Sequence, residues 1–335
     1  MSVTEPLDPP RRRALRRRLA VVAIGLALPV VLVELGLRLF DPMVTAEAIE
    51  RERFSSDVLI ATPDGDFALR PGARGSLFGT EAVIGAHGFR SPPVATPRPD
   101  DVYRVLIVGD SVAFGWGVAE ADAFPRVMER ELNAAPLRSG KRRVEVIAAA
   151  VPGWGMPHYL RFVEAQGRAW QPDVVIVTLI NNDLTDLIDA QDQRPREKPF
   201  LLPAWLRWTY LSRVVEQTVA RFGDRAVRSD FFVAIELDPE RRRIAGALIC
   251  QGFTRMKELL GEVPLCVMDT IVGHDGERLD DVVACAAQGG FTRIDASLAR
   301  PDYKAVYAVG RTDDHPNAAG HKELARIAVE WLRAR

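Results

Sequence analysis

Three side chains in this sequence are of the types that acyl transfer to a serine requires. Ser111 ends the tripeptide Gly109-Asp110-Ser111, which follows an apolar, β-branched run, and His315 lies near the C-terminus beside Asp313 and Asp314. A serine hydroxyl is a weak nucleophile at its own pKa, so a base must take its proton, and His315 is the candidate base. A neighbouring carboxylate would hold the imidazole in one tautomer. Gly-Asp-Ser alone is more often a simple turn, so the prediction depends on the distant histidine.

The tetrahedral intermediate of acyl transfer also needs hydrogen-bond donors aimed at its oxyanion. We expect these donors to be the backbone N–H groups of Ser111 and Gly153 and the side-chain amide of Asn182. Glycine at position 153 would let the backbone approach a substrate with no Cβ in the way. Asn182 taken alone is as well explained as a helix cap.

The elements that must position these residues alternate regularly after residue 100. Predicted strands cover 103–108, 143–149, 174–179, 265–268 and 292–295, and predicted helices cover 124–133, 156–170, 238–260, 279–288 and 318–332. Such alternation implies right-handed crossovers and a mostly parallel sheet of about five strands, covered on both faces. Because the functional crevice of such a sheet lies at the carboxyl ends of its strands, we expect the candidate residues to converge there.

An insertion at about 184–237 interrupts this rhythm. Its helical section places Trp205, Trp208 and Leu211 on roughly one face. Packing against a satellite core explains this stripe best, and the alternative is a lid or acyl-binding wall over the site.

Composition indicates a globular protein. The 335 residues are 47% hydrophobic and 27% charged, and the net charge of −1 argues against a nucleic-acid partner. Cys250, Cys266 and Cys285 are too few and too scattered for a disulfide framework or a zinc site, so we expect buried, apolar cysteines.

The N-terminus predicts a membrane anchor. A basic tail, residues 1–18, holds six arginines directly before an apolar segment, residues 19–40, in which Glu34 and Arg38 can pair one helical turn apart. The uncharged part, 19–33, would span only about 22 Å as a helix, but the whole segment reaches the ~30 Å of a hydrocarbon core. A cleaved signal is less consistent because the nearest small-x-small site, Ala46-Glu47-Ala48, lies far beyond the apolar run. By the positive-inside rule the rest of the chain would lie outside the cytoplasm.

Residues 41–100 are rich in Pro, Gly and Asp and lack sustained periodicity. We expect a stalk followed by an irregular or β-rich preface to the main domain, residues 101–335. His87, beside glycines in this stretch, is predicted to be a turn residue with no catalytic role.

Together these residues resemble the SGNH hydrolases, also called GDSL-type esterases and lipases. The resemblance rests on Gly-Asp-Ser at the first strand, Gly153, Asn182-Asp183, and the C-terminal Asp/His pair before Pro-Asn-x-x-Gly-His, and it covers roughly residues 100–335. It implies Ser111 as nucleophile, His315 as general base, an orienting aspartate, and an oxyanion hole of Ser111, Gly153 and Asn182. It also implies a flavodoxin-like three-layer α/β/α sandwich that uses no cofactor and no metal. The anchor and the segment Gly88-Phe89-Arg90 are similar to membrane-anchored bacterial members.

The sequence departs from the family pattern at the acid. The usual spacing is Asp-x-x-His, but Thr312 stands three residues before His315, so the acid must be Asp313 or Asp314. A side chain two residues before an extended histidine lies on its side of the chain, which favours Asp313. If neither carboxylate contacts His315, a Ser-His dyad remains. Ile180 also replaces the glycine of the common Gly-x-Asn-Asp block.

Two other site types fit less well. An α/β-hydrolase elbow is disfavoured because Ala113 breaks Gly-x-Ser-x-Gly and because the acid lies next to the histidine. A metal site at Asp313, Asp314, His315 and His321 lacks a third ligand region, and His321 in the last helix suits a structural role.

The sequence therefore predicts a single-pass inner-membrane protein with a periplasmic or extracellular serine esterase domain. Its substrate would be a small-molecule, lipid or carbohydrate ester carrying an acyl or acetyl group. The alternatives are an O-acyltransferase acting on envelope carbohydrate and a non-catalytic envelope binding module on the same fold.

Overall fold

The computed structural model divides the chain into two units, one formed by 1–50 with 196–228 and one by 51–195 with 229–335. The structure describes residues 9–40, 57–62, 67–77, 80–135, 137, 140–180, 183, 209, 211, 239–270, 285–310 and 313–335. Asn182, Trp205 and Trp208 lie outside these residues, as does most of the predicted insertion.

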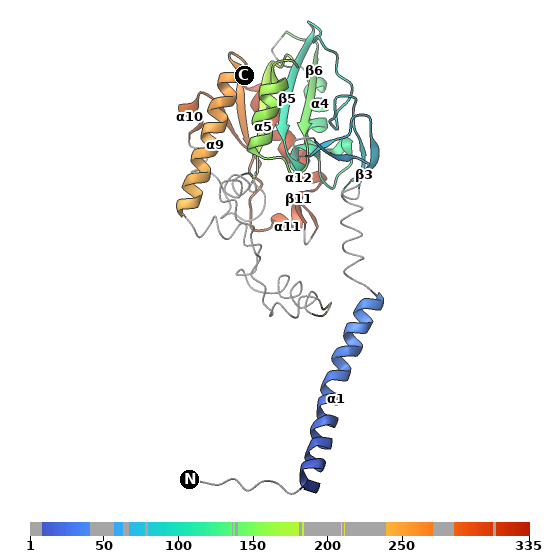
Figure 1. Ribbon diagram of the computed structural model, residues 1–335. Helices are drawn as coiled ribbons and strands as arrows, with labels where there is room; N and C mark the ends of the chain where they lie inside the picture. Colours follow the sequence, from blue (N-terminus) through green and yellow to red (C-terminus); the bar gives the residue numbers. More distant parts are fainter. Residues whose placement is uncertain are drawn as a thin grey trace. The chain divides into compact units, whose positions relative to one another are not determined.

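Among the described residues of the first unit is one long helix, α1 (Pro9–Phe40) (Figure 1). Within it, Arg16–Leu39 is long and apolar enough to cross a membrane, a property that signal sequences share. The predicted pair one turn apart is present, with Arg38 Nε 2.8 Å from Glu34 Oε1. The large apolar side chains of this helix are exposed, and among the described residues no protein core covers them.

The second unit is built on a five-stranded sheet in the order β6-β5-β7-β8-β9, and every pairing in it is parallel. The strands are β5 (Val102–Gly109), β6 (Arg143–Ala150), β7 (Val174–Leu179), β8 (Leu265–Asp269) and β9 (Thr292–Asp295). The predicted parallel sheet is thus confirmed, strand by strand. The apolar runs that predicted these strands are buried because helices cover both faces of the sheet.

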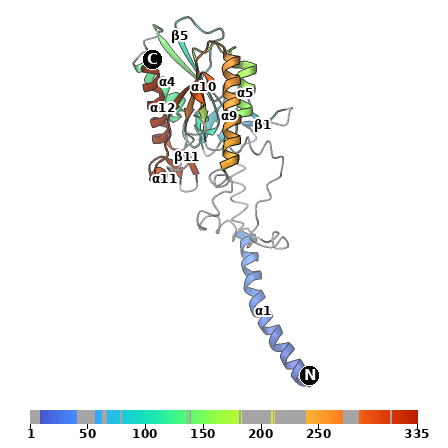
Figure 2. The ribbon, with the colours of Figure 1, turned by 90° about the vertical axis from the view of Figure 1, so that its left-hand side faces the viewer.

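Helices flank the sheet in two layers, which Figure 2 shows nearly edge-on. On one face α4 (Phe124–Ala134) packs against α12 (Ala318–Arg333), where the Phe124 N–H donates to His321 Nδ1 at 3.3 Å. On the other face lie α5 (Met156–Phe162) and α9 (Pro239–Leu260), which meet where Met156 packs over Gly252. The α-helix predicted over 156–170 is shorter in the structure. It ends at Phe162, and a π-helical turn, η2 (Val163–Gly167), follows it.

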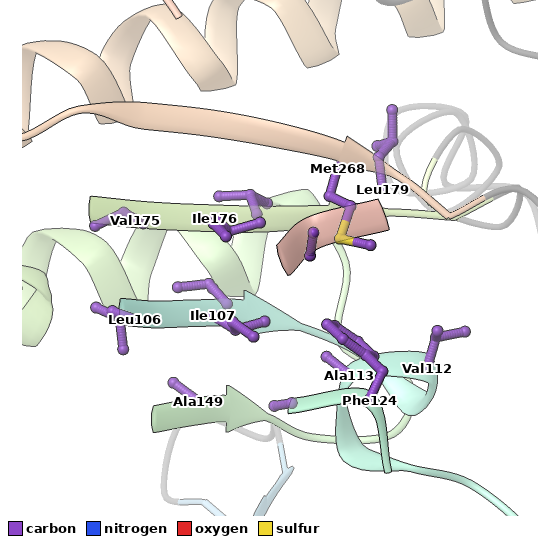
Figure 3. Packing of buried hydrophobic residues seen from close by; sticks show 14 of the residues in the cluster. Leu106, Ile107, Val112, Ala113, Phe124, Ala149, Val175, Ile176, Leu179 and Met268 are labelled. Carbon is purple, nitrogen blue, oxygen red and sulfur yellow. The ribbon is translucent and has the colours of Figure 1, made fainter. Parts of the chain in front are cut away.

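The core lies between these layers (Figure 3). Leu106 and Ile107 of β5 are fully buried and are paired with Val175 and Ile176 of β7. Each such side chain contributes about 1.5–3 kcal/mol to stability by leaving water. Because β5 is an interior strand, with β6 on one side and β7 on the other, the residues near its C-terminal end are held from both sides.

Two short hairpins precede the sheet within the same unit. The first joins β1 (Leu59–Ala61) to β2 (Phe67–Leu69), and the second joins β3 (Arg74–Leu77) to β4 (Thr80–Val83). The buried side chains of Leu69 and Leu77 belong to the main core. The β-rich preface is therefore part of the body that carries the sheet.

The prediction of free cysteines is wrong at two positions. Cys250, in α9, forms a disulfide with Cys285, which directly precedes α10 (Ala286–Gly289), and their Cα atoms are 6.0 Å apart. Cys266 is buried and free, as predicted, and burial raises the pKa of its thiol to about 12. No local pattern indicates the pair, because packing of α9 beside α10 brings together residues 35 positions apart.

Candidate active site

Ser111 lies where β5 turns sharply into the single-turn helix α3 (Ser111–Phe114). Asp110 caps this turn, since its Oδ1 accepts the Val112 N–H at 3.1 Å. Gly109 is required by packing, because a Cβ there would lie 2.0 Å from Thr178 Oγ1. The Gly-Asp-Ser tripeptide thus combines close packing, a cap and a hydroxyl at the carboxyl end of an interior strand of the sheet.

His315 lies on a second strand pair, β10 (Ala308–Gly310) with β11 (Asp313–Pro316), which the sequence did not predict. Its Nε2 is 2.9 Å from Ser111 Oγ, and its Nδ1 is 2.7 Å from Asp313 Oδ1. If Nδ1 carries the proton for the carboxylate, Nε2 is left as an acceptor for the serine hydroxyl. Residues 204 positions apart in sequence are therefore in hydrogen-bond contact.

The two candidate acids have different surroundings. Asp313 lies in extended backbone two residues before His315, and its Oδ1 also accepts the His315 N–H at 3.0 Å. Asp314 points away, with half its side chain exposed and its Oδ1 3.0 Å from Lys304 Nζ. Burial alone would raise the pKa of Asp313, but the hydrogen bonds and charge of His315, with a further bond from Trp116, lower it to about 2. Asp313 therefore stays ionised at neutral pH.

Trp116 is a site residue that the sequence did not reveal. Its indole ring stacks on the His315 imidazole with centroids 4.2 Å apart and planes 7° from parallel. Its Nε1 donates to Asp313 Oδ2 at 2.9 Å. A parallel aromatic face favours an imidazolium over a neutral ring. The only available signal was an aromatic residue between Gly115 and Gly117 just after the serine.

Asp110 is a second acceptor for the serine hydroxyl, with Oδ2 3.1 Å from Ser111 Oγ. Burial raises the pKa of Asp110, although the Val112 N–H, the charge of His315 and the Ser111 hydroxyl oppose this. One hydroxyl proton cannot serve two acceptors at once. Asp110 and His315 are therefore alternative acceptors for the Ser111 hydroxyl.

Arg90, the last residue of the Gly88-Phe89-Arg90 segment, holds the loop after α3 from the N-terminal side, a role that the sequence did not reveal. Its guanidinium is buried and donates to the backbone carbonyls of Gly115 at 2.9 Å and Val118 at 3.1 Å. It also donates to the Glu81 carbonyl at 2.9 Å. These bonds tie β4 to the segment that carries Trp116.

Of the three predicted oxyanion donors, Ser111 and Gly153 lie within the described residues and Asn182 does not. The Val151 N–H donates to the Gly109 carbonyl at 3.3 Å, which places the start of the Gly153 turn beside the serine turn. Gly153 has a φ of +87°, a conformation that favours glycine. Asp183, next to Asn182, is buried, and its Oδ2 accepts the Ile180 N–H at 2.8 Å.

Two further described histidines, His321 and His87, have other surroundings. His321 is fully buried in α12, and burial, with the charges of His315 and Arg90, lowers its pKa to about 3. His87, in the preface, stacks on Phe89 and meets Trp170 edge-on. No group of three or more His, Cys, Asp or Glu side chains suited to a metal ion occurs in the described part of the chain.

Comparison with known proteins gives one family match and several similar solved structures. The model of the GDSL-like lipase/acylhydrolase family matches residues 107–323. No curated protein matches the chain significantly. Among solved structures, a lipase/acylhydrolase from Enterococcus faecalis is 14% identical with a TM-score of 0.42, over 70% of this chain and 96% of that one. A catalytic mutant of an acetylxylan esterase from Geobacillus stearothermophilus is 15% identical with a TM-score of 0.43, over 69% and 94%.

The family match includes β7, β8 and β9 together with the segments of Ser111, Gly153 and His315, and it covers well over half of the 335 residues. Members of this family act on ester bonds as hydrolases. The chain therefore belongs to the GDSL-like lipase/acylhydrolase family.

Proposed function

We propose that this protein is a membrane-anchored serine esterase that removes an acyl or acetyl group through an acyl-serine intermediate. The observation that carries the proposal is the hydrogen-bonded chain from Asp313 through His315 to Ser111, with contacts of 2.7 and 2.9 Å. A carboxylate, an imidazole that it orients, and a hydroxyl, in this order, are the requirements for activating a serine.

In the acylation step Ser111 Oγ forms a bond to the ester carbonyl carbon while its proton passes to His315 Nε2. The resulting oxyanion accepts hydrogen bonds from the Ser111 and Gly153 N–H groups and from the Asn182 amide. The bond to the leaving oxygen then breaks, and His315 returns the proton to that oxygen, which releases an alcohol. Asp313 and the stacked Trp116 stabilise the transient imidazolium.

In the deacylation step a water molecule attacks the acyl-serine, and His315 Nε2 takes a proton from it. The bond from the acyl carbon to Oγ breaks, the proton returns to Oγ, and a carboxylic acid leaves. Each donor of the oxyanion hole contributes about 2.7–4 kcal/mol of transition-state stabilisation.

We place the catalytic domain outside the cytoplasmic membrane. Arginines precede the apolar part of α1, which by the positive-inside rule keeps the N-terminus in the cytoplasm. The Cys250–Cys285 disulfide supports this orientation, because disulfides persist in oxidising compartments such as the periplasm.

The test uses the full-length chain in lipid nanodiscs with a fluorophosphonate probe and p-nitrophenyl acetate. We expect covalent labelling and acetate release, and both should disappear in Ser111→Ala. Folded protein that is neither labelled nor active contradicts the proposal and favours a binding module. If added sugar acceptors become acylated while free acetate falls, the enzyme is an O-acyltransferase.

A further inference from the structure

A cavity of about 480 Å³ lies between the β1–β2 hairpin and α5, and no step of the proposed reaction uses it. Its lining is mostly apolar and includes Ile60, Phe67, Leu69, Phe89, Trp154 and Phe162. This volume is within the range of small-molecule sites, which are typically lined by apolar and aromatic side chains. The cavity is therefore large enough to hold part of a substrate.

The aromatic walls of the cavity are held in place by the protein itself. Phe89 meets Phe162 edge-on with ring centroids 5.4 Å apart, and it meets Trp154 in the same way at 6.1 Å. The Tyr159 hydroxyl donates to the Trp154 carbonyl at 3.3 Å. The indole N–H of Trp154 donates to the Phe67 carbonyl at 3.4 Å. The shape of the cavity thus exists before any ligand enters.

The cavity begins at the candidate oxyanion turn. Val151 and Trp154, on either side of Gly153, both line it. A Cβ on Gly153 would lie 3.1 Å from the Phe67 ring, so Phe67 covers that side of the turn. A carbonyl group held by the Gly153 N–H would have the cavity as its neighbour.

The position of His315 decides which half of an ester faces the cavity. His315 directly precedes α12, which packs with α4 on one face of the sheet, whereas α5 lines the cavity on the other face (Figure 2). The leaving oxygen must lie beside His315 Nε2 to receive its proton. The acyl group on the opposite side of the carbonyl carbon is therefore directed away from His315.

The chemistry of the lining favours an alkyl chain over a sugar. Apolar residues outnumber polar ones in the lining, and no carboxylate is among the described residues there. The Nδ1 of His158 already accepts the Gly155 N–H at 3.1 Å, and the other polar residues are Thr62, His87, Arg161 and Gln166. Recognition of a sugar would need several convergent polar groups that are free to bind hydroxyls. Apolar and aromatic surfaces instead bind methylene groups by removing them from water.

We propose that this cavity binds the acyl chain of the ester and gives the enzyme a preference for medium-length linear acyl groups. The inference rests on the proposed esterase function. The hairpin side of the cavity, residues 60–89, precedes the segment that the family model matches. The preference would thus come from a part of this chain that lies outside the shared family core.

The test is a series of p-nitrophenyl esters from acetate to octanoate with the full-length chain in nanodiscs. We expect kcat/KM to rise by about threefold to fourfold for each added methylene while the chain remains in the cavity. Ala165→Trp places an indole at an exposed position in the cavity wall and should lower the octanoate-to-acetate ratio of kcat/KM at least tenfold. Ala247→Trp, on an exposed part of α9 away from the cavity, is the matched control and should keep the wild-type ratio.

Two results would overturn the acyl assignment: a flat or falling acyl series in the wild type, or an unchanged ratio in Ala165→Trp. A second series with a constant acetyl group and alcohols of increasing length provides a further check. If Ala165→Trp alters that series instead, the cavity binds the alcohol and the assignment is wrong.

A binding measurement separates failure of this inference from failure of the esterase proposal. Calorimetric titration of Ser111→Ala with octanoate requires no turnover. Octanoate binding that Ala165→Trp abolishes supports the cavity assignment even if no ester is hydrolysed. Absence of octanoate binding overturns the assignment even if acetate is hydrolysed.

Discussion

The indole N–H of Trp116 donates a 2.9 Å hydrogen bond to Asp313 Oδ2, the carboxylate oxygen that His315 does not contact. Asp313 is thereby fixed through both of its oxygens, one to the imidazole and one to a ring that stacks on the same imidazole. This arrangement compensates for the short Asp-x-His spacing, because it fixes the orientation of a carboxylate that lies only two residues from the base.

Trp116→Phe should retain an aromatic face over His315 but remove the donor to Asp313. A hydrogen bond to a charged group contributes about 1.5–3 kcal/mol, so we expect kcat to fall by about tenfold or more. Loss of this bond should also raise the pKa of Asp313 above its value of about 2, because the bond favours the carboxylate, so activity should be lost at a higher pH on acidification. The measurement is the pH dependence of p-nitrophenyl acetate hydrolysis. Trp331→Phe, on α12, is the matched control, and equal behaviour of the two variants would contradict a positioning role for Trp116.

Asp313→Asn and Asp314→Asn form a matched pair that tests which acid orients His315. An amide at 313 would no longer select the Nδ1–H tautomer, and kcat should fall by about 10³–10⁴. Asp314→Asn removes only a partly exposed ion pair with Lys304 and should change kcat by less than about twofold. Steady-state kinetics with circular dichroism as a folding control distinguish the two. A severe loss in the 314 variant alone would reverse the assignment.

Gly153→Ala should reduce activity more than stability. The φ of +87° disfavours alanine by about 1 kcal/mol, and the new Cβ would press on the Phe67 ring and displace the N–H of residue 153. We expect a loss of about tenfold or more in kcat. Gly261→Ala carries similar backbone strain at a φ of +62° with open space around it, so it is the control for strain alone. Equal kinetic effects in both variants would exclude a special role for the 153 turn.

His321 should make the protein sensitive to mild acid. The buried imidazole is neutral in the folded protein because its pKa is lowered to about 3, whereas an unfolded histidine takes up a proton below about pH 6.5. The unfolded chain therefore binds more protons in this window, and folding stability falls as pH falls from about 6.5 towards 3. Between pH 6.5 and pH 4 the loss should be about 3 kcal/mol.

Urea unfolding of the full-length chain in lipid vesicles at several pH values measures this loss. His321→Asn removes the titrating group, so its stability should depend less steeply on pH, even though the substitution lowers stability at neutral pH. An identical slope in wild type and variant would show that other groups cause the acid sensitivity.

The sheet could be predicted from the sequence because each strand is a local apolar run. Val105 and Val174 lie in such runs, and the structure pairs them in parallel register. The preference for Asp313 over Asp314 also came from a local property, the two-residue period of extended backbone. Local patterns were therefore enough to predict the strands and to rank two adjacent acids.

The features that the sequence did not reveal are contacts between distant residues. Trp116 meets Asp313 across 197 positions, and Arg90 meets the Val118 carbonyl across 28. The Cys250–Cys285 bond likewise depends on how α9 packs beside α10. Residue type alone carried little information about these pairs, because a tryptophan, an arginine or a cysteine has many possible partners in a chain of this length.

The bonds from Arg90 to the backbone after α3 have a practical consequence for minimal versions of this protein. A protein shortened to residues 107–323 would retain Ser111, Gly153 and His315 but would lack Arg90, the Phe67 ring and the last turns of α12. The loop that carries Trp116 would then have no support from its N-terminal side. Deletion studies should consequently begin upstream of the first hairpin and continue to the final helical residue, since residues that support the candidate site lie outside the segment that the family model matches.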